Sequence, residues 1–401
     1  MPTPPGRISS GLPPLDDAAR AHATRVYRHI CRHIEASGGW IPFAVFMDLA
    51  LYTPGLGYYA AGARKFGSES DFVTAPEMTP LFGRTVARQV AQVLEQVGGD
   101  VVEFGAGSGL LAADMLDELE RLGRLPARYR ILEPSAELAQ RQQQLLRQRS
   151  PAMFGRVEWM ATLECLGSPA AGFRGVVVAN EVLDAIPVHI LVWRREGLFE
   201  RGVALEDDAL VWQERPAGQS LQAAAGRIGT VATDAGLPYV SEVSPATTAL
   251  VGSLARGIDR GAVLLMDYGF PRAEYYHPQR RAGTLMCHYR HHAHDDALFL
   301  PGLQDITAHV DFTAVAEAGV DAGCRIAGYT TQAQFLINCG ITELLAHTPA
   351  EDIAAYLPQA TAVQKLLSPA EMGELFKVLA LSRGIDVPLL GFVDGDRIGR
   401  L

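Results

Sequence analysis

A glycine-rich segment at residues 101–115, with the sequence VVEFGAGSGLLAADM, contains residue types that can bring the backbone close to a small ligand. A short apolar strand pattern comes first, Gly105, Gly107 and Gly109 follow, and a pattern typical of an amphipathic helix ends the segment. Glycines in such a turn let the backbone approach a ligand, and the N-terminus of the next helix offers unpaired N–H groups. The segment therefore predicts a ligand-binding turn between a strand and a helix.

The spacing of these glycines disfavours two common nucleotide-binding motifs. A dinucleotide fingerprint requires a third glycine at the position of Leu110. A phosphate-binding P-loop requires a lysine followed by serine or threonine, and this pair does not follow the glycines. A nicotinamide-dependent oxidoreductase is therefore the least favoured of the functions that we consider.

Two acidic residues accompany the glycine turn. Glu103 stands two residues before Gly105, and a carboxylate so placed suits a cation, such as the ammonium or sulfonium of S-adenosylmethionine. Glu133 ends the next expected strand, where a doubly wound nucleoside site places a carboxylate on the ribose hydroxyls. Alternatively, the glycines only form a turn and the acids are solvated strand ends. We assign six residues of this region to binding of S-adenosylmethionine: Glu103, Gly105, Ala106, Gly107, Gly109 and Glu133.

A second polar group follows the apolar run at residues 175–180. Asn180, Glu181 and Asp184 stand at the expected carboxyl edge of the sheet, where sheets of this class bind ligands. Glu181 and Asp184 are three residues apart, so a helical turn would place both carboxylates on one face. We predict that Asn180 and Glu181 contact the donor, that Glu181 is catalytic and that Asp184 steers the acceptor. Alternatively, Asn180 caps a helix and none of these residues is catalytic.

A loop at residues 66–80 is a candidate cover for the donor. It is rich in turn-forming residues and shows little periodicity, which is more typical of a functional loop than of a simple connection. Asp71, Thr74 and Pro76 are its candidate donor-binding residues, with Glu77 beside them. Alternatively, the loop only packs against the rest of the fold.

Three further positions are candidates, and one cluster is set aside. Thr162 and Leu163 follow the third expected strand and could flank the adenine. His309 could act as a general base near neutral pH, or could simply pack in its strand. The segment at 287–296, CHYRHHAHDD, lacks an established ligand spacing, so we predict no metal site.

Short apolar strands alternate with amphipathic helices from about residue 80 to residue 180, which predicts a parallel sheet covered on both faces. We expect an N-terminal arm, helices and donor-covering loop at residues 1–80, followed by one elaborated α/β core at 81–401. Insertions are expected at about 188–255, which contains hairpin patterns, and at about 270–320, which reads largely as a long loop. A helical segment is expected at about 332–372.

The composition is that of a soluble globular chain, with 401 residues and 48% hydrophobic residues. A net charge of −10 disfavours binding to nucleic acid, and five scattered cysteines fit reduced thiols. The first twenty residues contain five prolines and two aspartates, which fits neither a signal peptide nor a mitochondrial transit peptide. No apolar run reaches the roughly 18 residues needed to span a bilayer. We therefore expect a cytoplasmic protein without membrane insertion.

Several sequence blocks together resemble the MidA-like class I methyltransferases, whose mitochondrial members include a complex I assembly-factor arginine methyltransferase. The blocks cover almost the whole chain from about residue 45 to residue 382, and the second and fourth are more specific than the glycine motif. They are LYTPGLGYYA (51–60), FGSESDFVTAPEMTPLFG (66–83), VVEFGAGSG (101–109), ANEVLDAIPV (179–188), SEVSP (241–245), DYG (267–269), DITAHVDF (305–312), TQAQFLINCGI (331–341) and SPAEMGELFKVLAL (368–381).

The resemblance implies a doubly wound, Rossmann-like class I methyltransferase sheet with a helical N-terminal addition and inserted β-hairpins and helices. It also implies methyl transfer from S-adenosylmethionine to a protein side chain, with arginine, for instance in a complex I subunit, as the acceptor. Two alternatives remain open: a small-molecule methyltransferase, and an assembly factor that binds the donor without catalysing a reaction. The sequence does not indicate the oligomeric state.

Overall fold

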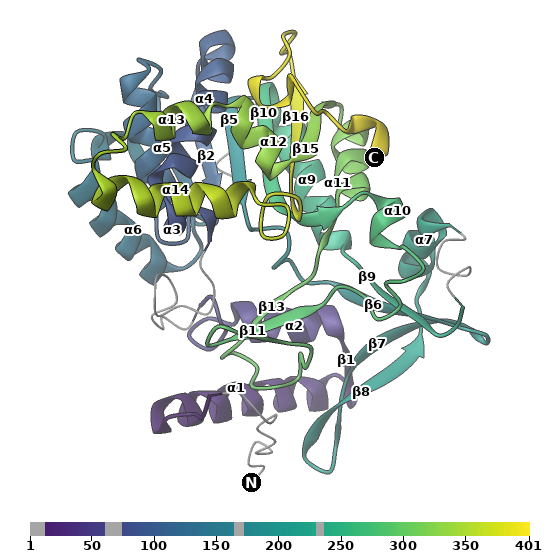
Figure 1. The fold of residues 1–401 in the computed structure, drawn as a ribbon. Coiled ribbons are helices and arrows are strands. Elements are labelled where there is room, and N and C mark those ends of the chain that lie inside the picture. The colour runs from purple at the N-terminus through teal and green to yellow at the C-terminus, as the bar shows by residue number, and fades with distance from the viewer. Residues whose placement is uncertain (1–12, 61–73, 164–171, 230–235) are drawn as a thin grey trace. The chain divides into compact units, whose positions relative to one another are not determined.

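The computed structural model describes residues 13–60, 74–163, 172–229 and 236–401 (Figure 1). The chain divides into two compact units, each built from several segments. The N-terminal unit comprises residues 1–72, 184–247 and 272–309, and the core unit comprises residues 73–183, 248–271 and 310–401. Each unit is described separately.

The core unit is built on an eight-stranded sheet, seven strands of which form one continuous row. In spatial order the seven strands are β4 (Val157–Met160), β3 (Tyr129–Leu132), β2 (Asp100–Phe104), β5 (Phe173–Asn180), β10 (Ile258–Phe270), β16 (Phe376–Arg383) and β15 (Arg325–Thr331), and β14 (Val310–Asp311) pairs with β10. The strands from β4 to β10 are parallel, whereas β16 runs antiparallel to both of its neighbours. This order confirms the doubly wound sheet expected from the sequence.

The order of the strands creates a switch point between β2 and β5. From β2 the chain continues to β3 and β4 on one side of the sheet, and then returns to β5 on the other side of β2. The connections leaving β2 and β5 therefore diverge, and the crevice at their carboxyl ends is where sheets of this kind bind ligands. The glycine turn follows β2, and Glu181 follows β5.

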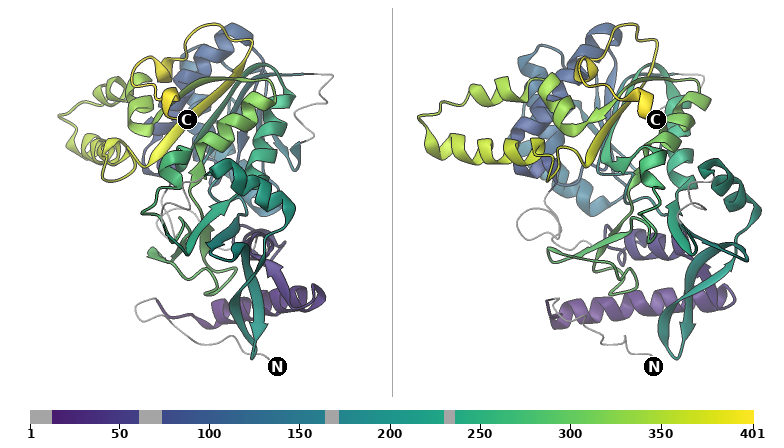
Figure 2. Two further views of the ribbon diagram at one scale, coloured as in Figure 1. Left: turned by 90° about the vertical axis from the view of Figure 1, so that its right-hand side faces the viewer. Right: turned by 45° about the vertical axis from the view of Figure 1, so that its right-hand side comes forward.

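Helices cover both faces of the core sheet (Figure 2). One face, which carries Val176, Val178 and Leu264, shares a single hydrophobic core with α4, α5, α12, α13 and α14. On the opposite face, α11 lies against β16, where Gly319 leaves room for the Leu381 side chain. The helices of this unit are α3 (Ala75–Met78), α4 (Pro80–Val97), α5 (Leu110–Arg121), α6 (Ala136–Arg149), α9 (Pro245–Gly257, which starts in the N-terminal unit), α11 (Phe312–Asp321), α12 (Gln332–Asn338), α13 (Ile341–Ala346), α14 (Ile353–Leu367) and the short 3-10 helices Phe154–Arg156, Leu390–Phe392 and Ile398–Arg400.

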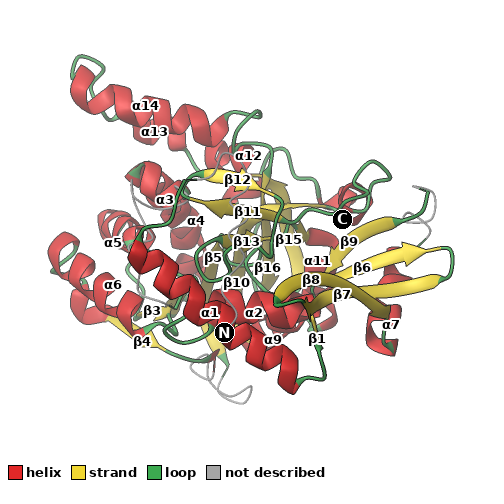
Figure 3. Cartoon of the chain, turned by 90° about the horizontal axis from the view of Figure 1, so that it is seen from below, coloured by secondary structure: helices red, strands yellow, loops and turns green. Residues whose placement is uncertain are grey.

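The N-terminal unit contains two smaller sheets (Figure 3). The first has the order β1 (Trp40–Pro42), β7 (Gly197–Glu206), β6 (His189–Arg194) and β9 (Tyr239–Val243), and β8 (Ala209–Pro216) also pairs with β7. The second has the order β12 (His292–His294), β11 (Met286–Tyr289) and β13 (Asp305–Thr307). The helices are α1 (Asp17–Ala36), α2 (Phe43–Tyr52), α7 (Gln219–Ile228) and α10 (Arg272–Tyr275).

The β6–β7–β8 hairpins confirm the hairpin patterns expected within residues 188–255. Two features differ from the sequence-based expectation. Residues 40–42 form a strand because they pair with β7, and residues 286–307 form a small sheet rather than a loop. The strand at 40–42 depends on pairing with a distant strand, which local periodicity does not reveal, whereas the sheet at 286–307 forms by antiparallel pairing within that segment.

Candidate active site

The glycine turn after β2 adopts a backbone conformation that favours glycine. Gly105, Gly107 and Gly109 have φ values of +62°, +52° and +88°, in the left-handed region that other residues rarely adopt. A Cβ atom on Gly105 would also lie 2.9 Å from Cγ2 of Val182, in the segment after β5. The turn therefore packs against the connection on the other side of the switch point and leads directly into α5, which begins at Leu110.

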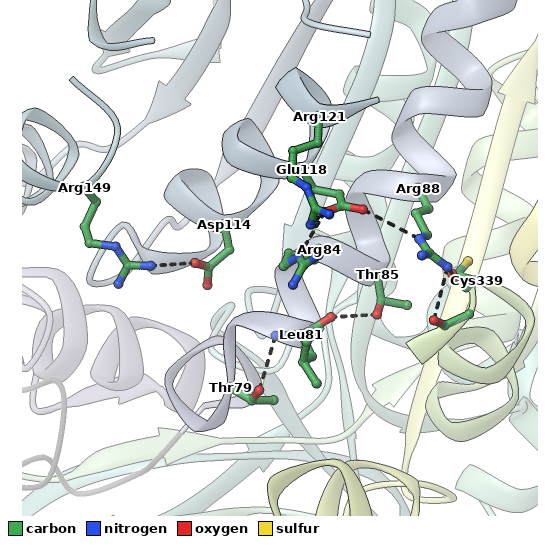
Figure 4. A network of polar contacts seen from close by, with 11 residues as sticks. Thr79, Leu81, Arg84, Thr85, Arg88, Asp114, Glu118, Arg121, Arg149 and Cys339 are labelled. Atoms are coloured by element: carbon green, nitrogen blue, oxygen red, sulfur yellow. Dashed lines mark hydrogen bonds and ion pairs between the residues drawn. The ribbon is translucent and has the colours of Figure 1, made fainter. Parts of the chain in front are cut away.

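Ion pairs fix α5 between its neighbouring helices (Figure 4). Glu118 of α5 pairs with Arg84 of α4 at 2.9 Å, and Arg121 also reaches its carboxylate at 3.2 Å. Asp114 of α5 pairs with Arg149 of α6 at 3.0 Å. Burial raises the pKa of Asp114 to about 6, an effect that the Arg149 charge partly opposes. These contacts hold the helix whose N-terminus follows the glycine turn.

Glu133 lies directly after β3, at the same edge of the sheet, and is buried. Its Oε1 accepts the backbone N–H of Ser135 at 2.9 Å, and its Oε2 accepts an N–H of Gln142 at 3.0 Å. Burial raises the pKa of Glu133, and these two hydrogen bonds lower it. A carboxylate can accept about four hydrogen bonds, so Glu133 retains capacity for the hydroxyl groups of a ligand.

Glu103 lies in the interior, not at the edge of the sheet. It is 1% exposed within β2 and accepts a 2.5 Å hydrogen bond from the hydroxyl of Tyr129, which also lies 3.7 Å from the sulfur of Met115. Burial raises the pKa of Glu103 to about 7, and the Tyr129 hydrogen bond opposes this rise. The Glu103 side chain is thus buried within the sheet next to Tyr129, before the glycine turn begins. Its contact with a ligand stays a prediction.

Asn180 and Glu181 lie at the carboxyl end of β5. Oε1 of Glu181 accepts an N–H of Asn180 at 3.0 Å and the backbone N–H of Ala75 at 3.3 Å. Asn180 is 8% exposed, and its Oδ1 is buried without a hydrogen-bond partner among the described residues. An unsatisfied buried acceptor is costly, so the Asn180 carbonyl oxygen suits a donor group of a ligand.

The Glu181 carboxyl group has an environment that favours its neutral form. Burial, followed by the nearby charge of Asp267, raises the pKa of Glu181 to about 8, although the N–H groups of Asn180 and Ala75 oppose the rise. Glu181 also has a φ of +54°, which is uncommon for a residue with a side chain and often marks a functional site. Glu181 can therefore gain or lose a proton near neutral pH.

Asp267, three residues before the end of β10, holds the segment that contains Glu181. Its Oδ2 accepts the backbone N–H groups of Val182 at 3.1 Å and of Leu183 at 2.7 Å, and Oδ1 accepts that of Tyr268 at 2.8 Å. Sequence analysis assigned Asp267 no role. The available signal was a carboxylate at the end of the otherwise apolar run AVLLMD.

A helical turn, which would place the carboxylates of Glu181 and Asp184 on one face, does not form at these residues. Residues 181–184 form a bend and the start of a turn, and the positive φ of Glu181 is incompatible with a right-handed helix. Asp184 belongs to the N-terminal unit, where its carbonyl oxygen accepts the backbone N–H of Ala308 at 2.9 Å. His309 belongs to the same unit, and its backbone N–H contacts Oγ1 of Thr284 at 3.1 Å.

Two segments of the core unit contain the candidates Thr74, Pro76, Thr162 and Leu163. Thr74 precedes α3, and Pro76 lies in its first turn, next to the Ala75 N–H that contacts Glu181. Thr162 and Leu163 follow β4, the former exposed and the latter half-buried. Asp71 lies outside the described residues. Within the described part of the chain, no group of three or more His, Cys, Asp and Glu residues is arranged to hold a metal ion.

Comparison with known proteins identifies relatives of the whole chain. The model of a family described as "Putative S-adenosyl-L-methionine-dependent methyltransferase" matches residues 85–330. A protein arginine methyltransferase NDUFAF7 homolog, mitochondrial, from Drosophila melanogaster is 30% identical over 402 residues, covering 89% of this chain and 86% of the relative. The rat mitochondrial protein arginine methyltransferase NDUFAF7 is 28% identical over 403 residues, covering 93% and 87%.

Solved structures agree with these relatives. A Burkholderia thailandensis protein bound to S-adenosyl-homocysteine is 48% identical, has a TM-score of 0.92 and is covered over its full length by 97% of this chain. A native structure of a protein from the same organism is 47% identical with a TM-score of 0.89. S-adenosyl-homocysteine is what remains of S-adenosylmethionine after methyl transfer. The first structure therefore supports the expected donor.

The comparisons correct the expected location. A cytoplasmic protein was expected from the sequence, but the named arginine methyltransferase relatives are mitochondrial proteins, which contradicts that expectation. The prediction relied on the composition of the first twenty residues, which is a weak signal. None of the helices in the described residues is long and apolar enough to cross a membrane.

Proposed function

Since the chain belongs to this family of S-adenosyl-L-methionine-dependent methyltransferases, and is itself such an enzyme, we propose that its acceptor is an arginine side chain of a protein. The names of the mitochondrial relatives support a protein arginine acceptor. We further propose a subunit of respiratory complex I as the first acceptor to test, because the resembled family includes a complex I assembly factor. Both steps go beyond the methyltransferase activity itself.

The observation that carries this proposal is the pair formed by Asn180 and Glu181 at the switch point. The pair presents a carbonyl oxygen that has no hydrogen-bond partner within the described part of the chain, beside a carboxyl group with a pKa of about 8. An arginine guanidinium presents five N–H donors, stays protonated in water and therefore needs acceptors and a carboxylate when it is desolvated. The two side chains supply both kinds of group.

Several residues are proposed to hold the donor. The backbone of Gly105, Ala106, Gly107 and Gly109 would approach it closely, and Glu133 would accept its ribose hydroxyls. Thr74 and Pro76, with Asp71, would cover it, whereas Thr162 and Leu163 would flank the adenine. Glu103 and Asn180 are the candidates for its cationic end, since the Asn180 carbonyl oxygen has two lone pairs and can accept a hydrogen bond from the donor as well as one from the guanidinium. When bound, S-adenosylmethionine supplies the methyl group from its sulfonium.

Glu181 would act on the acceptor. Methylation forms a nitrogen–carbon bond as the carbon–sulfur bond breaks, and one proton leaves the guanidinium. Glu181 in its ionised form would accept that proton, and its negative charge would hold the guanidinium in line with the methyl group. Asp184 and His309 of the N-terminal unit remain candidates for steering the acceptor and for proton transfer, respectively.

Transfer of radiolabel from the donor tests the acceptor. The purified protein is incubated with methyl-labelled S-adenosylmethionine and an extract of cells that lack the gene, and the products are separated by size. We expect the label in protein, with methylarginine after hydrolysis. Label that enters only the small-molecule filtrate would identify a small-molecule methyltransferase and contradict the proposal.

A further inference from the structure

Gln142 is a buried glutamine of α6 that connects three segments of the proposed donor site. It is 0% exposed. Its Nε2 donates to the carbonyl oxygen of Gly107 at 3.0 Å and to Oε2 of Glu133 at 3.0 Å, and its Oε1 accepts the indole N–H of Trp159 at 3.0 Å. The glycine turn after β2, the carboxylate after β3 and the third residue of β4 thus meet at one side chain.

The hydrogen bonds determine the orientation of the Gln142 amide. Its two acceptors, the Gly107 carbonyl and the Glu133 carboxylate, require the nitrogen on their side, and the Trp159 indole can only donate. The reversed amide would lose all three bonds. With the Ser135 N–H on Oε1 and Gln142 on Oε2, the Glu133 carboxylate is held at both oxygens.

The glycine turn is shaped around α6 at the same point. A Cβ atom on Gly109 would lie 3.4 Å from Cα of Gln142, so the turn and the helix are in close contact. Among the described residues, the side chain of Gln142 hydrogen-bonds only to Gly107, Glu133 and Trp159. Two of these three belong to the proposed donor site.

We propose that Gln142 is a positioning residue for the methyl donor, which acts by fixing the Glu133 carboxylate relative to the glycine turn. The inference rests on the proposed contact between Glu133 and the ribose. It predicts that loss of the Gln142 amide weakens donor binding chiefly by releasing Glu133. A glutamine that only stabilised the fold would not depend on Glu133 in this way.

The test is a double-mutant cycle read by calorimetric titration with S-adenosyl-homocysteine. The proteins are the wild type, Gln142→Leu, Glu133→Ala and the double variant. We expect Gln142→Leu to weaken binding roughly tenfold in the wild-type background, as loss of a hydrogen bond to a charged group does. In the Glu133→Ala background the same change should alter affinity by less than about twofold, because coupled residues are not additive.

Gln89 offers a matched control in the same unit. It is also a 0% exposed glutamine, its Nε2 donates to Gln92 at 2.9 Å, and its Oε1 accepts the backbone N–H of Gly391 at 2.8 Å. Gln89→Leu should lower the melting temperature as Gln142→Leu does and leave the affinity for S-adenosyl-homocysteine unchanged. If Gln142→Leu does not fold, Gln142→Met, which keeps the shape of the side chain, takes its place in the cycle.

The outcomes separate the inference from its premise. An equal loss of affinity on Gln142→Leu in both backgrounds would overturn the role of Gln142 and leave that of Glu133 intact. Unchanged affinity of Glu133→Ala alone would remove the ribose contact and the inference with it. A loss in Gln89→Leu as large as that in Gln142→Leu would show a general effect of instability and would also overturn the inference.

Discussion

The carboxylate of Asp267 accepts the backbone N–H of Leu183 at 2.7 Å, so a residue of β10 holds the segment that follows the neighbouring strand β5. The same oxygen accepts the N–H of Val182 at 3.1 Å. Glu181, directly before these two residues, has a left-handed backbone and a carboxyl group near the Asp267 charge. One buried aspartate therefore influences both the position and the pKa of the proposed catalytic residue.

Methyl transfer should rise with pH as Glu181 loses its proton. The ionised form accepts the proton of the guanidinium, and burial together with the Asp267 charge raises the pKa of Glu181 to about 8. The rate should therefore increase through about pH 8 and level off above it. A profile of kcat/KM between pH 6 and pH 10 checks this, and a rate that does not change over that range would contradict it.

Asp267→Asn should move that profile to lower pH. The negative charge of Asp267 disfavours ionisation of Glu181, so a neutral amide should lower the pKa of Glu181. The asparagine oxygen can still accept a backbone N–H, which limits the damage to the segment after β5. The measurement is the midpoint of the pH profile of the variant, and an unchanged midpoint would show that the charge has no influence.

Glu133→Ala should weaken binding of S-adenosylmethionine by about 1.5–3 kcal/mol, the usual contribution of hydrogen bonds to a charged group. The methyl-transfer rate at saturating donor should change less. Calorimetry and initial rates measure the two effects. Unchanged affinity would show that Glu133 does not contact the ribose.

Gly105→Ala should weaken donor binding and destabilise the protein. The alanine has to adopt a φ of +62°, which costs about 1–2 kcal/mol, and its Cβ would lie 2.9 Å from Val182. Gly123 is a matched control because its φ is +64° and a Cβ atom there meets nothing within 4 Å. Gly123→Ala should share the backbone cost and keep normal affinity, as measured by unfolding and calorimetry.

Glu103 should make the protein less stable as the pH rises from about 4.5 to about 7. Burial raises its pKa from 4.5 to about 7 in the folded protein, so the folded state holds a proton that the unfolded state has lost. Glu103→Gln removes this penalty and keeps an acceptor for the Tyr129 hydroxyl. The variant should gain stability relative to the wild type between pH 5 and pH 8, by about 3 kcal/mol for a shift of this size.

Chemical unfolding of the wild type and Glu103→Gln at pH 5 and at pH 8 measures their free energies of unfolding and checks this prediction. Because the wild type and Glu103→Gln differ at one residue only, the difference between them cancels the contribution of other buried acids, including Glu181. An identical pH dependence of both proteins would show that Glu103 is ionised in the folded state throughout this range.

Local patterns in the sequence were sufficient to predict much of the core unit. Strands β2 to β5, helices α5 and α6 and the glycine turn all follow from short apolar runs and glycine spacing. Parallel sheets of this kind generally bind ligands at the carboxyl ends of their strands. Glu133, Asn180 and Glu181 each follow an expected strand, so they could be assigned to that edge without a structure.

Features that depend on distant contacts were not predictable in this way. The roles of Asp267 and Gln142 arise from hydrogen bonds to segments far away in the sequence, and β1 arises from pairing with the remote strand β7. The strands β11–β13 pair with one another within residues 286–307, in a segment whose pattern indicated a loop. A right-handed helical turn does not form at Glu181 because its φ is positive, which the local sequence does not reveal. Glu103 faces the interior because Tyr129 supplies its hydrogen bond there.

The central claim is that Glu181 serves methyl transfer to arginine and not the binding of the donor alone. The most direct test compares the wild type with Glu181→Gln in the labelled-donor assay on protein and in titration with S-adenosyl-homocysteine. We predict methylarginine formation by the wild type, a kcat lowered about 100- to 10,000-fold in the variant, and donor affinity within a few-fold of normal. Full activity of a folded Glu181→Gln protein, or wild-type protein that binds the donor and labels no arginine, would contradict the account.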